Sequence, residues 1–211
     1  MGEGAAKVLA QAGDALLLER ATGDRSLVEM ARDGRDDEAS RTICSVAARL
    51  HAPRANRPSK LTPLSEWFAA LDPAAARHGG ILHLAASTAR ELLADPRDIT
   101  VLHGDIHNGN ILDFGPRGWL AIDPKGLIGE RGYDFANMFN NPDSAVAATP
   151  GCLARQATVV ADAADLDRSR LMRWVLAYSG LSAAWFLADG DEAAATLPMT
   201  IAGIAVAELG S

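Results

Sequence analysis

The stretch Val101-Leu-His-Gly-Asp-Ile-His-Asn-Gly-Asn-Ile-Leu-Asp-Phe114 is the most informative part of this sequence. It places Asn110 five residues after Asp105, and a second acid, Asp123, follows the apolar run Trp119–Ile122. One carboxylate can accept the proton of an attacking hydroxyl, while an amide and a second carboxylate supply the hard oxygen ligands that Mg²⁺ prefers. The order of these residues therefore suits phosphoryl transfer, with Asp105 as the base and Asn110 and Asp123 as metal ligands.

Two histidines beside the base allow a second interpretation. His103 and His107 are four residues apart, as in a metal-binding helical pair, but the glycines of the loop disfavour a helix and the glutamate of the H-E-x-x-H motif is absent. A zinc site built from these histidines with Asp105 and Asp123 is therefore the weaker alternative. We expect His103 to be a buried hydrogen-bonding brace of the loop and His107 to lie closer to the phosphates.

The segments around this loop predict a small β-layer within a mostly helical α+β fold. Thr100–Leu102, Ile111–Phe114 and Trp119–Ile122 are rich in strand-forming residues, and a glycine-containing turn joins the last two. Nearer the start, Lys7–Gln11 and Ala15–Arg20 fit a hairpin. Apolar residues at helical spacing predict helices over residues 36–50, 64–71, 81–93, 133–140, 151–164, 167–187 and 191–209.

Length, composition and charge narrow the class of protein. With 211 residues, of which 48% are hydrophobic, the chain can bury one substantial core or two unequal ones. A net charge of −7 without a basic run argues against a nucleic-acid partner and suits a cationic small-molecule substrate. Two distant cysteines indicate a reduced, cytoplasmic protein, and neither a signal peptide nor a membrane span is evident. The sequence leaves the oligomeric state undetermined.

The loop resembles that of a known enzyme family. The spacing of His103, Asp105 and Asn110 matches the kinase catalytic-loop pattern H-x-D-x-x-x-x-N, with Asp123 in the place of the D-F-G acid. The intervening glycine, the second histidine and Ile-Asp-Pro resemble the aminoglycoside phosphotransferases. Four segments resemble one branch of that family, the streptomycin 6-kinases and hydroxyurea phosphotransferases. They are Ile122–Phe139, Ala15–Ala21, Ala48–His51 and Leu181–Trp185.

This resemblance implies a fold, an activity and two ligands. The fold would be the large, C-terminal lobe of a protein-kinase-like enzyme, and the activity would be transfer of phosphate from ATP, with Mg²⁺, to a hydroxyl of a streptomycin-like aminoglycoside or to hydroxyurea, conferring antibiotic resistance. Asp134 would accept hydrogen bonds from the backbone of the catalytic loop. The backbone of a hinge would face the adenine, at Leu18, Glu19, Arg20 and Ala21.

Several acids could face the positive charge of such a substrate, because a partly desolvated cation needs carboxylate partners. Glu130 is one candidate, and the others are Asp189, Asp191 and Glu192. For the last three, capping of a helix N-terminus is the favoured alternative.

In this family a small lobe with a phosphate loop and a nucleotide-binding lysine precedes the hinge, whereas here 14 residues precede Ala15. Of the lysines, Lys7, Lys60 and Lys125, none is where that lysine is expected. We therefore expect residues 1–21 to be a remnant small-lobe hairpin with the hinge, and residues 22–211 to be the helical large lobe with the catalytic loop and the substrate cleft. The alternative function is a catalytically silent lobe that binds a ligand or a partner without turnover.

Overall fold

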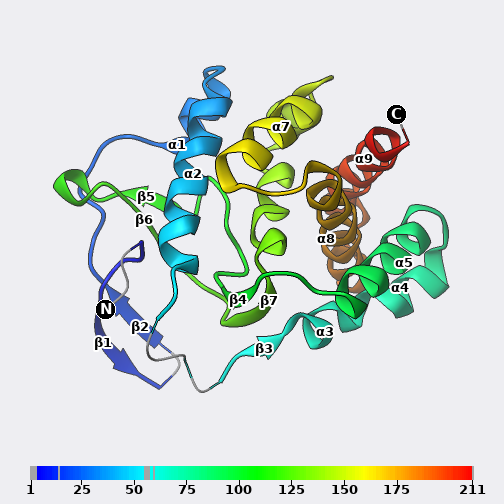
Figure 1. The fold of residues 1–211 in the computed structure, drawn as a ribbon, viewed down its shortest axis with the longest axis horizontal. Coiled ribbons are helices and arrows are strands. Elements are labelled where there is room, and N and C mark those ends of the chain that lie inside the picture. The colour runs from blue at the N-terminus through cyan, green and yellow to red at the C-terminus, as the bar shows by residue number, and fades with distance from the viewer. Residues whose placement is uncertain (1–3, 14, 55–57, 59, 211) are drawn as a thin grey trace.

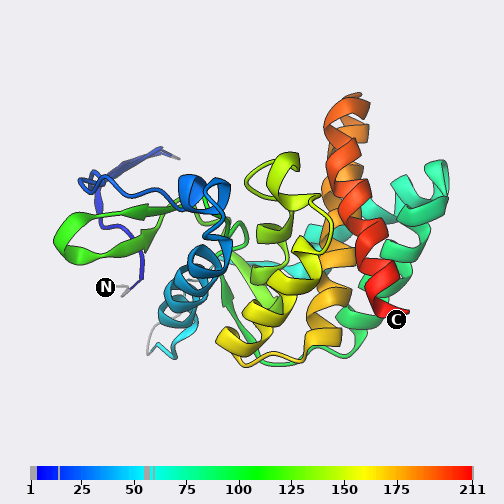
Figure 2. The same ribbon diagram turned by 90° about the horizontal axis from the view of Figure 1, so that it is seen from above.

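The computed structural model describes residues 4–13, 15–54, 58 and 60–210. The molecule is elongated, with the N-terminal hairpin at one end and a group of helices at the other (Figures 1 and 2). The strands that carry the candidate catalytic residues lie between these two ends, next to helix α2 (Asp36–His51). The predicted α+β fold with mostly helical content is confirmed.

In the described part of the chain, the strands form three small sheets. The hairpin pairs β1 (Val8–Ala12) with β2 (Ala15–Leu18), as predicted, and its apolar side chains are largely exposed. A second hairpin pairs β5 (Ile111–Asp113) with β6 (Trp119–Ala121). The third sheet has the order β3-β7-β4, and its strands are β3 (Thr62–Pro63), β7 (Leu127–Glu130) and β4 (Ile99–Leu102).

The helices form one continuous core around α8 (Arg168–Ala188), which packs against α5 (Gly80–Ala94) and α9 (Glu192–Leu209). Aspartates cap the N-termini of α8 and α9, and α2 has acids in its first turn and bases in its last, as the helix dipole favours. The remaining helices are α1 (Leu27–Arg32), α3 (Leu64–Trp67), α4 (Leu71–His78), α6 (Ser144–Ala147) and α7 (Cys152–Ala164).

Both α8 and α9 are long and apolar enough to cross a membrane when judged by length and composition alone. The most apolar 18-residue stretch of α8 is 72% buried inside the fold, and that of α9 is 28% buried. A helix surrounded by other helices needs apolar residues on every side, so the hydropathy of α8 follows from its central position.

The strand pairings bring the parts of the catalytic loop together. In the antiparallel β4–β7 pair Leu102 lies opposite Leu127, so the loop that follows β4 begins beside the chain that leads from Asp123 into β7. In the β5–β6 hairpin, the backbone N–H of Ile122 donates to the carbonyl of Asn110 at 2.9 Å. Asn110 and Asp123 are thereby neighbours although thirteen positions separate them in the sequence.

The structure adds α1, α4, α6 and β3 to the predicted elements, and it differs from them most between residues 127 and 140. Strand β7 lies where no strand is predicted, and a Cβ at its Gly129 would lie 2.4 Å from the side chain of Leu64, so this glycine permits close packing of β7 against α3. The helix predicted over residues 133–140 is instead two 3₁₀ turns, η3 (Arg131–Phe135) and η4 (Asn137–Asn140). Side chains from both turns bond to the catalytic loop, which fixes their position.

Candidate active site

A buried carboxylate fixes the backbone of the loop after β4. The side chain of Asp134 has no exposed surface, and it accepts hydrogen bonds from the backbone N–H groups of His103 and Gly104 at 2.9 and 2.6 Å. His51 Nε2 lies 2.7 Å from the same carboxylate. Gly104 has a φ of 85°, and a Cβ there would come within 2.8 Å of Leu127, so glycine is required.

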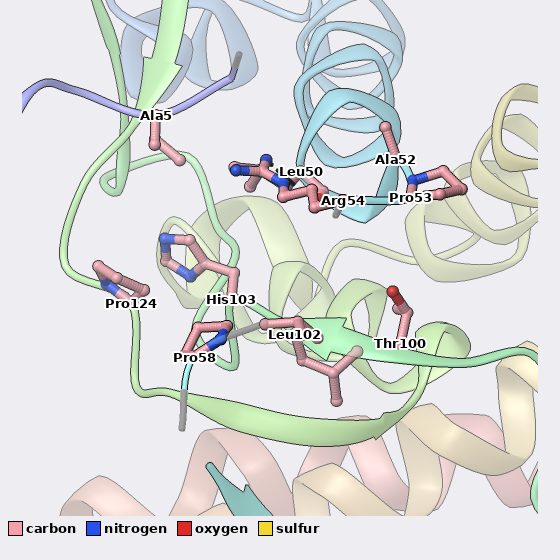
Figure 3. Close-up of a pocket in the computed structure, with 12 residues that line it drawn as sticks. Ala5, Leu50, Ala52, Pro53, Arg54, Pro58, Thr100, Leu102, His103 and Pro124 are labelled. Carbon is pink, nitrogen blue, oxygen red and sulfur yellow. Dashed lines mark hydrogen bonds between the residues drawn. The ribbon is translucent and has the colours of Figure 1, made fainter. Parts of the chain in front are cut away.

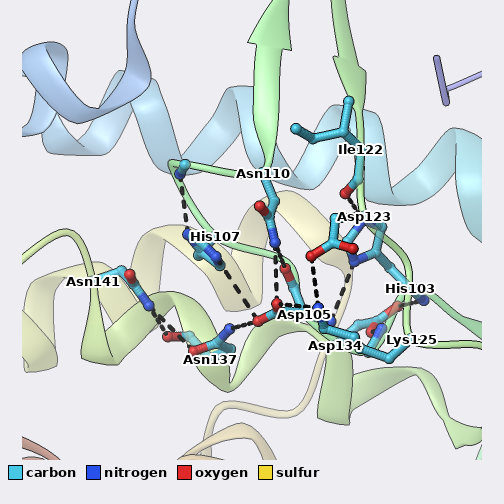
Figure 4. Close-up of polar contacts among 12 residues, drawn as sticks. His103, Asp105, His107, Asn110, Ile122, Asp123, Lys125, Asp134, Asn137 and Asn141 are labelled. Atoms are coloured by element: carbon cyan, nitrogen blue, oxygen red, sulfur yellow. Dashed lines mark hydrogen bonds and ion pairs between the residues drawn. The ribbon is translucent and has the colours of Figure 1, made fainter. Parts of the chain in front are cut away.

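The ring of His103 joins the loop after β4 to the segment after β6 (Figure 4). Its Nε2 lies 2.8 Å from the carbonyl oxygen of Ile122, and its Nδ1 accepts a hydrogen bond from the backbone N–H of Asp105 at 3.2 Å. A carbonyl can only accept, so this network assigns the proton to Nε2 and leaves Nδ1 unprotonated. Both ring nitrogens therefore have protein partners.

The carboxylate of Asp105 is held by donors on both oxygens. Asn137 Nδ2 donates to Oδ1 at 2.6 Å, and Asn110 Nδ2 donates to Oδ2 at 3.1 Å. The ammonium of Lys125 lies 3.2 Å from Oδ2, and His107 Nε2 lies 3.8 Å from Oδ1. A carboxylate with several hydrogen-bond donors is fixed in orientation, as a catalytic base must be.

Sequence reasoning missed the role of Asn137. Its side chain joins Asp105 to Asn141, because Asn141 Nδ2 donates to Oδ1 of Asn137 at 3.2 Å and to its carbonyl at 3.1 Å. This chain of amides orients the base through Oδ1, whereas Asn110 contacts Oδ2 (Figure 4). The available signal was the polar Asn137 between apolar residues in a segment already matched to the family, but its partner lies 32 positions away.

Each of the two candidate metal ligands has an oxygen atom that is open to a ligand. The amide nitrogen of Asn110 donates to Asp105, and the amide oxygen, Oδ1, has no hydrogen-bond partner among the described residues. Asp123 is 64% exposed and has a φ of 60°, a left-handed conformation that is uncommon outside glycine. An amide oxygen and a carboxylate fit Mg²⁺, which usually takes few protein ligands and completes its shell with phosphates and water.

Lys125 lies between the base and the candidate metal ligand. Its ammonium is 2.6 Å from Oδ2 of Asp123, and this hydrogen bond lowers the pKa of Asp123 and raises the pKa of Lys125. Burial lowers the pKa of His107, although the Asp105 carboxylate acts in the opposite direction. In the sequence, Lys125 does not stand where the nucleotide-binding lysine of the family is expected. The structure nevertheless brings it into the site.

The zinc alternative finds no support in the described part of the chain, where no group of three or more His, Cys, Asp or Glu side chains could hold a metal ion. Both nitrogens of His103 are already used within the protein. Nδ1 of His107 accepts the backbone N–H of Gly109 at 3.1 Å. The four residues therefore face different partners and do not surround one point.

The expected hinge, Leu18–Ala21, is tied to both hairpins. The carboxylate of Glu19 accepts the backbone N–H of Lys7 at 2.6 Å and forms an ion pair with Arg117 in the β5–β6 turn. The two peptide groups that follow Glu19 have no hydrogen-bond partner among the described residues, which leaves their N–H and C=O groups available to a ligand.

A second link between the hinge side and the β5–β6 hairpin was not anticipated from the sequence. Arg25 donates to both oxygens of the buried Asp113, at 2.7 and 3.0 Å, and its guanidinium lies 4.9 Å from the ring centre of Trp119. The hydrogen bond from Arg25 lowers the pKa of Asp113 to about 2. This contact fixes the hairpin that begins directly after Asn110.

The structure separates the candidate substrate acids from the base. Glu130 is buried at the far end of β7, where Arg170, the indole N–H of Trp174 and the backbone N–H of Arg97 all donate to it. Burial would raise the pKa of Glu130, but these donors outweigh burial and lower it. Its contacts are those of a structural brace.

The acids near the end of α8 are at helix termini. Asp191 caps α9 by accepting the backbone N–H of Ala194 at 2.9 Å, and Asp189 is the C-cap of α8. Glu192 occupies the first turn of α9. Of the three, only Asp191 caps a helix N-terminus as the alternative had it, whereas Asp189 is at the C-terminus of its helix. No described contact joins these three acids to the catalytic loop.

An aromatic cluster packs beside the base, and its members are Trp67, Phe68, Tyr133, Trp174, Tyr178 and Trp185. Trp67 donates its indole N–H to the hydroxyl of Tyr133 at 2.7 Å. Burial and, after it, the negative charge of Asp105 raise the pKa of Tyr178, so its hydroxyl stays protonated. That hydroxyl has no hydrogen-bond partner among the described residues and is a candidate contact for an acceptor.

A cavity of about 250 Å³ lies on the other side of the catalytic loop (Figure 3). Its walls come from the end of α2, from β4 and from the N-terminal segment near Ala5, and His103 and Pro124 complete it. Most of its lining is apolar. The brace histidine therefore separates this cavity from the carboxylate of Asp105.

Comparisons with known proteins show what this chain is similar to. A family described as aminoglycoside/hydroxyurea antibiotic resistance kinase matches residues 1–190. A streptomycin 3''-kinase from Klebsiella pneumoniae is 52% identical over 194 residues, which cover 90% of this chain and 73% of the relative. A streptomycin 6-kinase from Streptomyces griseus is 31% identical, and a hydroxyurea phosphotransferase from Kitasatospora aureofaciens is 30% identical. The matches cover 89% and 92% of this chain, but only 63% and 57% of these two relatives.

Solved structures show the same fold at low sequence identity. An aminoglycoside phosphotransferase in a ternary complex with ADP and hygromycin B has a TM-score of 0.70 at 14% identity, covering 99% of this chain and 78% of that one. A choline/ethanolamine kinase family protein from Mesorhizobium loti has a TM-score of 0.71 at 16% identity, covering 98% and 75%. An aminoglycoside phosphotransferase from Streptomyces rimosus, in complex with ADP and streptomycin, has a TM-score of 0.59 at 20% identity, covering 84% and 75%.

Proposed function

This chain belongs to the aminoglycoside/hydroxyurea antibiotic resistance kinase family, and from that premise we propose that it transfers the terminal phosphate of ATP to a hydroxyl of a streptomycin-type aminoglycoside. The observation that carries the proposal is 52% identity to a streptomycin 3''-kinase together with an Asp105 carboxylate that Asn110 holds directly and that Lys125 links to Asp123. Such a reaction in the cytoplasm would protect a cell from the antibiotic. Residues 1–21 would supply a small-lobe hairpin with the hinge, and residues 22–211 the catalytic lobe.

The residues of the chain have distinct tasks in this reaction. Asp105, oriented by Asn137 and Asn110, would accept the proton as the acceptor oxygen attacks phosphorus. The hinge backbone after Glu19 would bind the adenine edge, and Asp134 would keep the loop in place through its two backbone hydrogen bonds. Phosphoryl transfer depends mainly on such positioning and on charge stabilisation.

Asn110 and Asp123 would hold Mg²⁺, which when bound neutralises charge on the nucleotide phosphates. The unpartnered amide oxygen of Asn110 and the exposed carboxylate of Asp123 support this assignment. The Tyr178 hydroxyl and the partly exposed Trp67 and Trp185 would face the acceptor, because flat aromatic faces attract the guanidinium groups that a streptomycin-type substrate carries.

The direct test is to incubate the purified chain with Mg²⁺, ATP and streptomycin and to measure streptomycin-dependent release of ADP. We expect release with streptomycin and a slower rate with hydroxyurea. The phosphorylated hydroxyl is then identified by NMR of the product, because the relatives are named for two different positions. Binding of streptomycin without ADP release would favour the alternative, a lobe that binds its ligand without turnover.

Replacing Asp123 with alanine should weaken nucleotide binding only when Mg²⁺ is present, because its carboxylate is assigned to the metal and not to the nucleotide itself. By calorimetry we expect the affinity for Mg·ATP to fall about tenfold or more, which is the loss typical of one charged contact. Asp72→Ala is the matched control, since Asp72 is 63% exposed and has one ion pair on the surface. An equal loss with and without Mg²⁺ would show that Asp123 has a structural role instead.

A further inference from the structure

The ammonium of Lys125 occupies the space between the base and the acid assigned to the metal. It lies 3.2 Å from Oδ2 of Asp105 and 2.6 Å from Oδ2 of Asp123 (Figure 4). The other lysines, Lys7 and Lys60, are exposed and have no contact with these carboxylates. In the proposed reaction a phosphate would move from a nucleotide near Asp123 to a hydroxyl near Asp105, and this ammonium contacts both of those carboxylates.

An acceptor hydroxyl cannot reach Oδ2 of the base while both donors to that oxygen, Asn110 and Lys125, remain in place. A carboxylate offers about four lone-pair positions, and here Asn137, Asn110 and Lys125 fill three, with the ring of His107 near the fourth. Asn110 and Asn137 are held by further contacts of their own segments. Lys125 is different, because its ammonium is at the end of a flexible four-carbon chain.

The backbone of Lys125 is fixed while its side chain can move. Its backbone N–H donates to the carbonyl of His103 at 2.7 Å, which anchors the residue to the catalytic loop. Its side chain is 33% exposed, so the ammonium borders solvent on the side where Asp123 is open. A small rotation of the stem can therefore carry the charge from one acceptor to another without changing the loop.

We propose that Lys125 is a further catalytic residue, which moves its ammonium from Asp123 to the terminal phosphate of the bound nucleotide and so releases Oδ2 of Asp105 for the acceptor hydroxyl. This inference rests on the proposed phosphotransferase function. In the reaction the acceptor oxygen forms a bond to the terminal phosphorus, the bond from that phosphorus to the ADP oxygen breaks, and the hydroxyl proton goes to Asp105. Lys125 keeps its protons and contributes positive charge where the phosphate oxygens carry negative charge.

The test compares nucleotides that differ only in the terminal phosphate. Calorimetry with Mg²⁺ and no acceptor measures the affinities for ADP and for AMP-PNP, an ATP analogue that is not hydrolysed, in the wild-type chain and in three variants. Lys125→Met removes the charge, Lys125→Gln removes the charge but keeps a donor for both carboxylates, and Lys125→Arg keeps the charge. Lys60→Met is the matched control because it removes an exposed lysine outside the site.

We expect the preference for AMP-PNP over ADP to fall about tenfold in Lys125→Met and in Lys125→Gln, the loss typical of one charged hydrogen bond. Lys125→Arg and Lys60→Met should keep the wild-type preference. A thermal melt of each variant shows whether it folds. If Lys125→Met does not fold, the comparison of Lys125→Gln with the wild-type chain decides the test. Equal losses for both nucleotides would overturn the proposal and leave Lys125 as a structural link between two acids. A wild-type chain that binds the two nucleotides equally, or neither, would also overturn it.

The binding measurement separates this inference from the proposed function. If AMP-PNP preference depends on Lys125 but streptomycin causes no release of ADP, the acceptor assignment fails and the role of Lys125 stands. If streptomycin is phosphorylated and the preference is unchanged in Lys125→Gln, the proposed function stands and the role of Lys125 is rejected.

Discussion

Replacing Asp105 with asparagine is expected to lower streptomycin-dependent ADP release by about 100-fold or more, the usual loss for an acid–base group. Asparagine has nearly the same size and can still accept from Asn137 through its amide oxygen, so the loop should keep its position. The amide cannot take the proton of the acceptor hydroxyl. The expected result is therefore a loss of kcat with little change in the thermal midpoint or in Mg·ATP affinity.

A matched surface substitution shows whether this effect is specific to the site. Asp162→Asn makes the same chemical change at an exposed position of α7 and should leave the rate unchanged. Turnover by Asp105→Asn at the wild-type rate would refute the assignment of the base. An equal fall in rate and thermal midpoint would show instead that Asp105 supports the fold of the loop.

Replacing Asp134 with alanine is expected to cause the largest loss of stability in the chain's catalytic region. Its removal leaves the buried N–H groups of His103 and Gly104 without an acceptor, at about 1–3 kcal/mol each, and also leaves His51 without its partner. For a domain of this size, a total of about 3 kcal/mol corresponds to a fall of roughly 6–12 °C in thermal midpoint. Turnover should fall as well, since the loop that carries Asp105 loses its anchor.

Thermal melts followed by circular dichroism measure this loss directly. Asp143→Ala serves as the control, because Asp143 also accepts backbone hydrogen bonds and an ion pair but lies at the surface, where water can replace it. We expect a small shift for Asp143→Ala and a large one for Asp134→Ala. Shifts of equal size would show that the buried hydrogen bonds of Asp134 add nothing beyond those of an ordinary helix cap.

Much of the fold could be predicted because its signals are local. Apolar spacing located α2, α5, α7, α8 and α9 within a few residues, and the glycine-containing turn located the β5–β6 hairpin. The errors lie where tertiary contacts override local preference. Strand β7 contains Gly129 because Leu64 fills the space of a side chain, and the turns after it are held by the bonds of Asp134 and Asn137 to the loop.

The sequence by itself determined the kind of chemistry, since the spacing of Asp105, Asn110 and Asp123 within one loop and one hairpin fixes which groups lie on neighbouring strands. Only the tertiary structure decided which other groups meet them. The contact of Asn137 with Asp105 spans 32 positions and that of His51 with Asp134 spans 83. Lys125 turns toward both carboxylates only once β4 and β7 pair. The physical reason is that spacing constrains residues within one element, whereas contacts between distant elements depend on how the whole core packs.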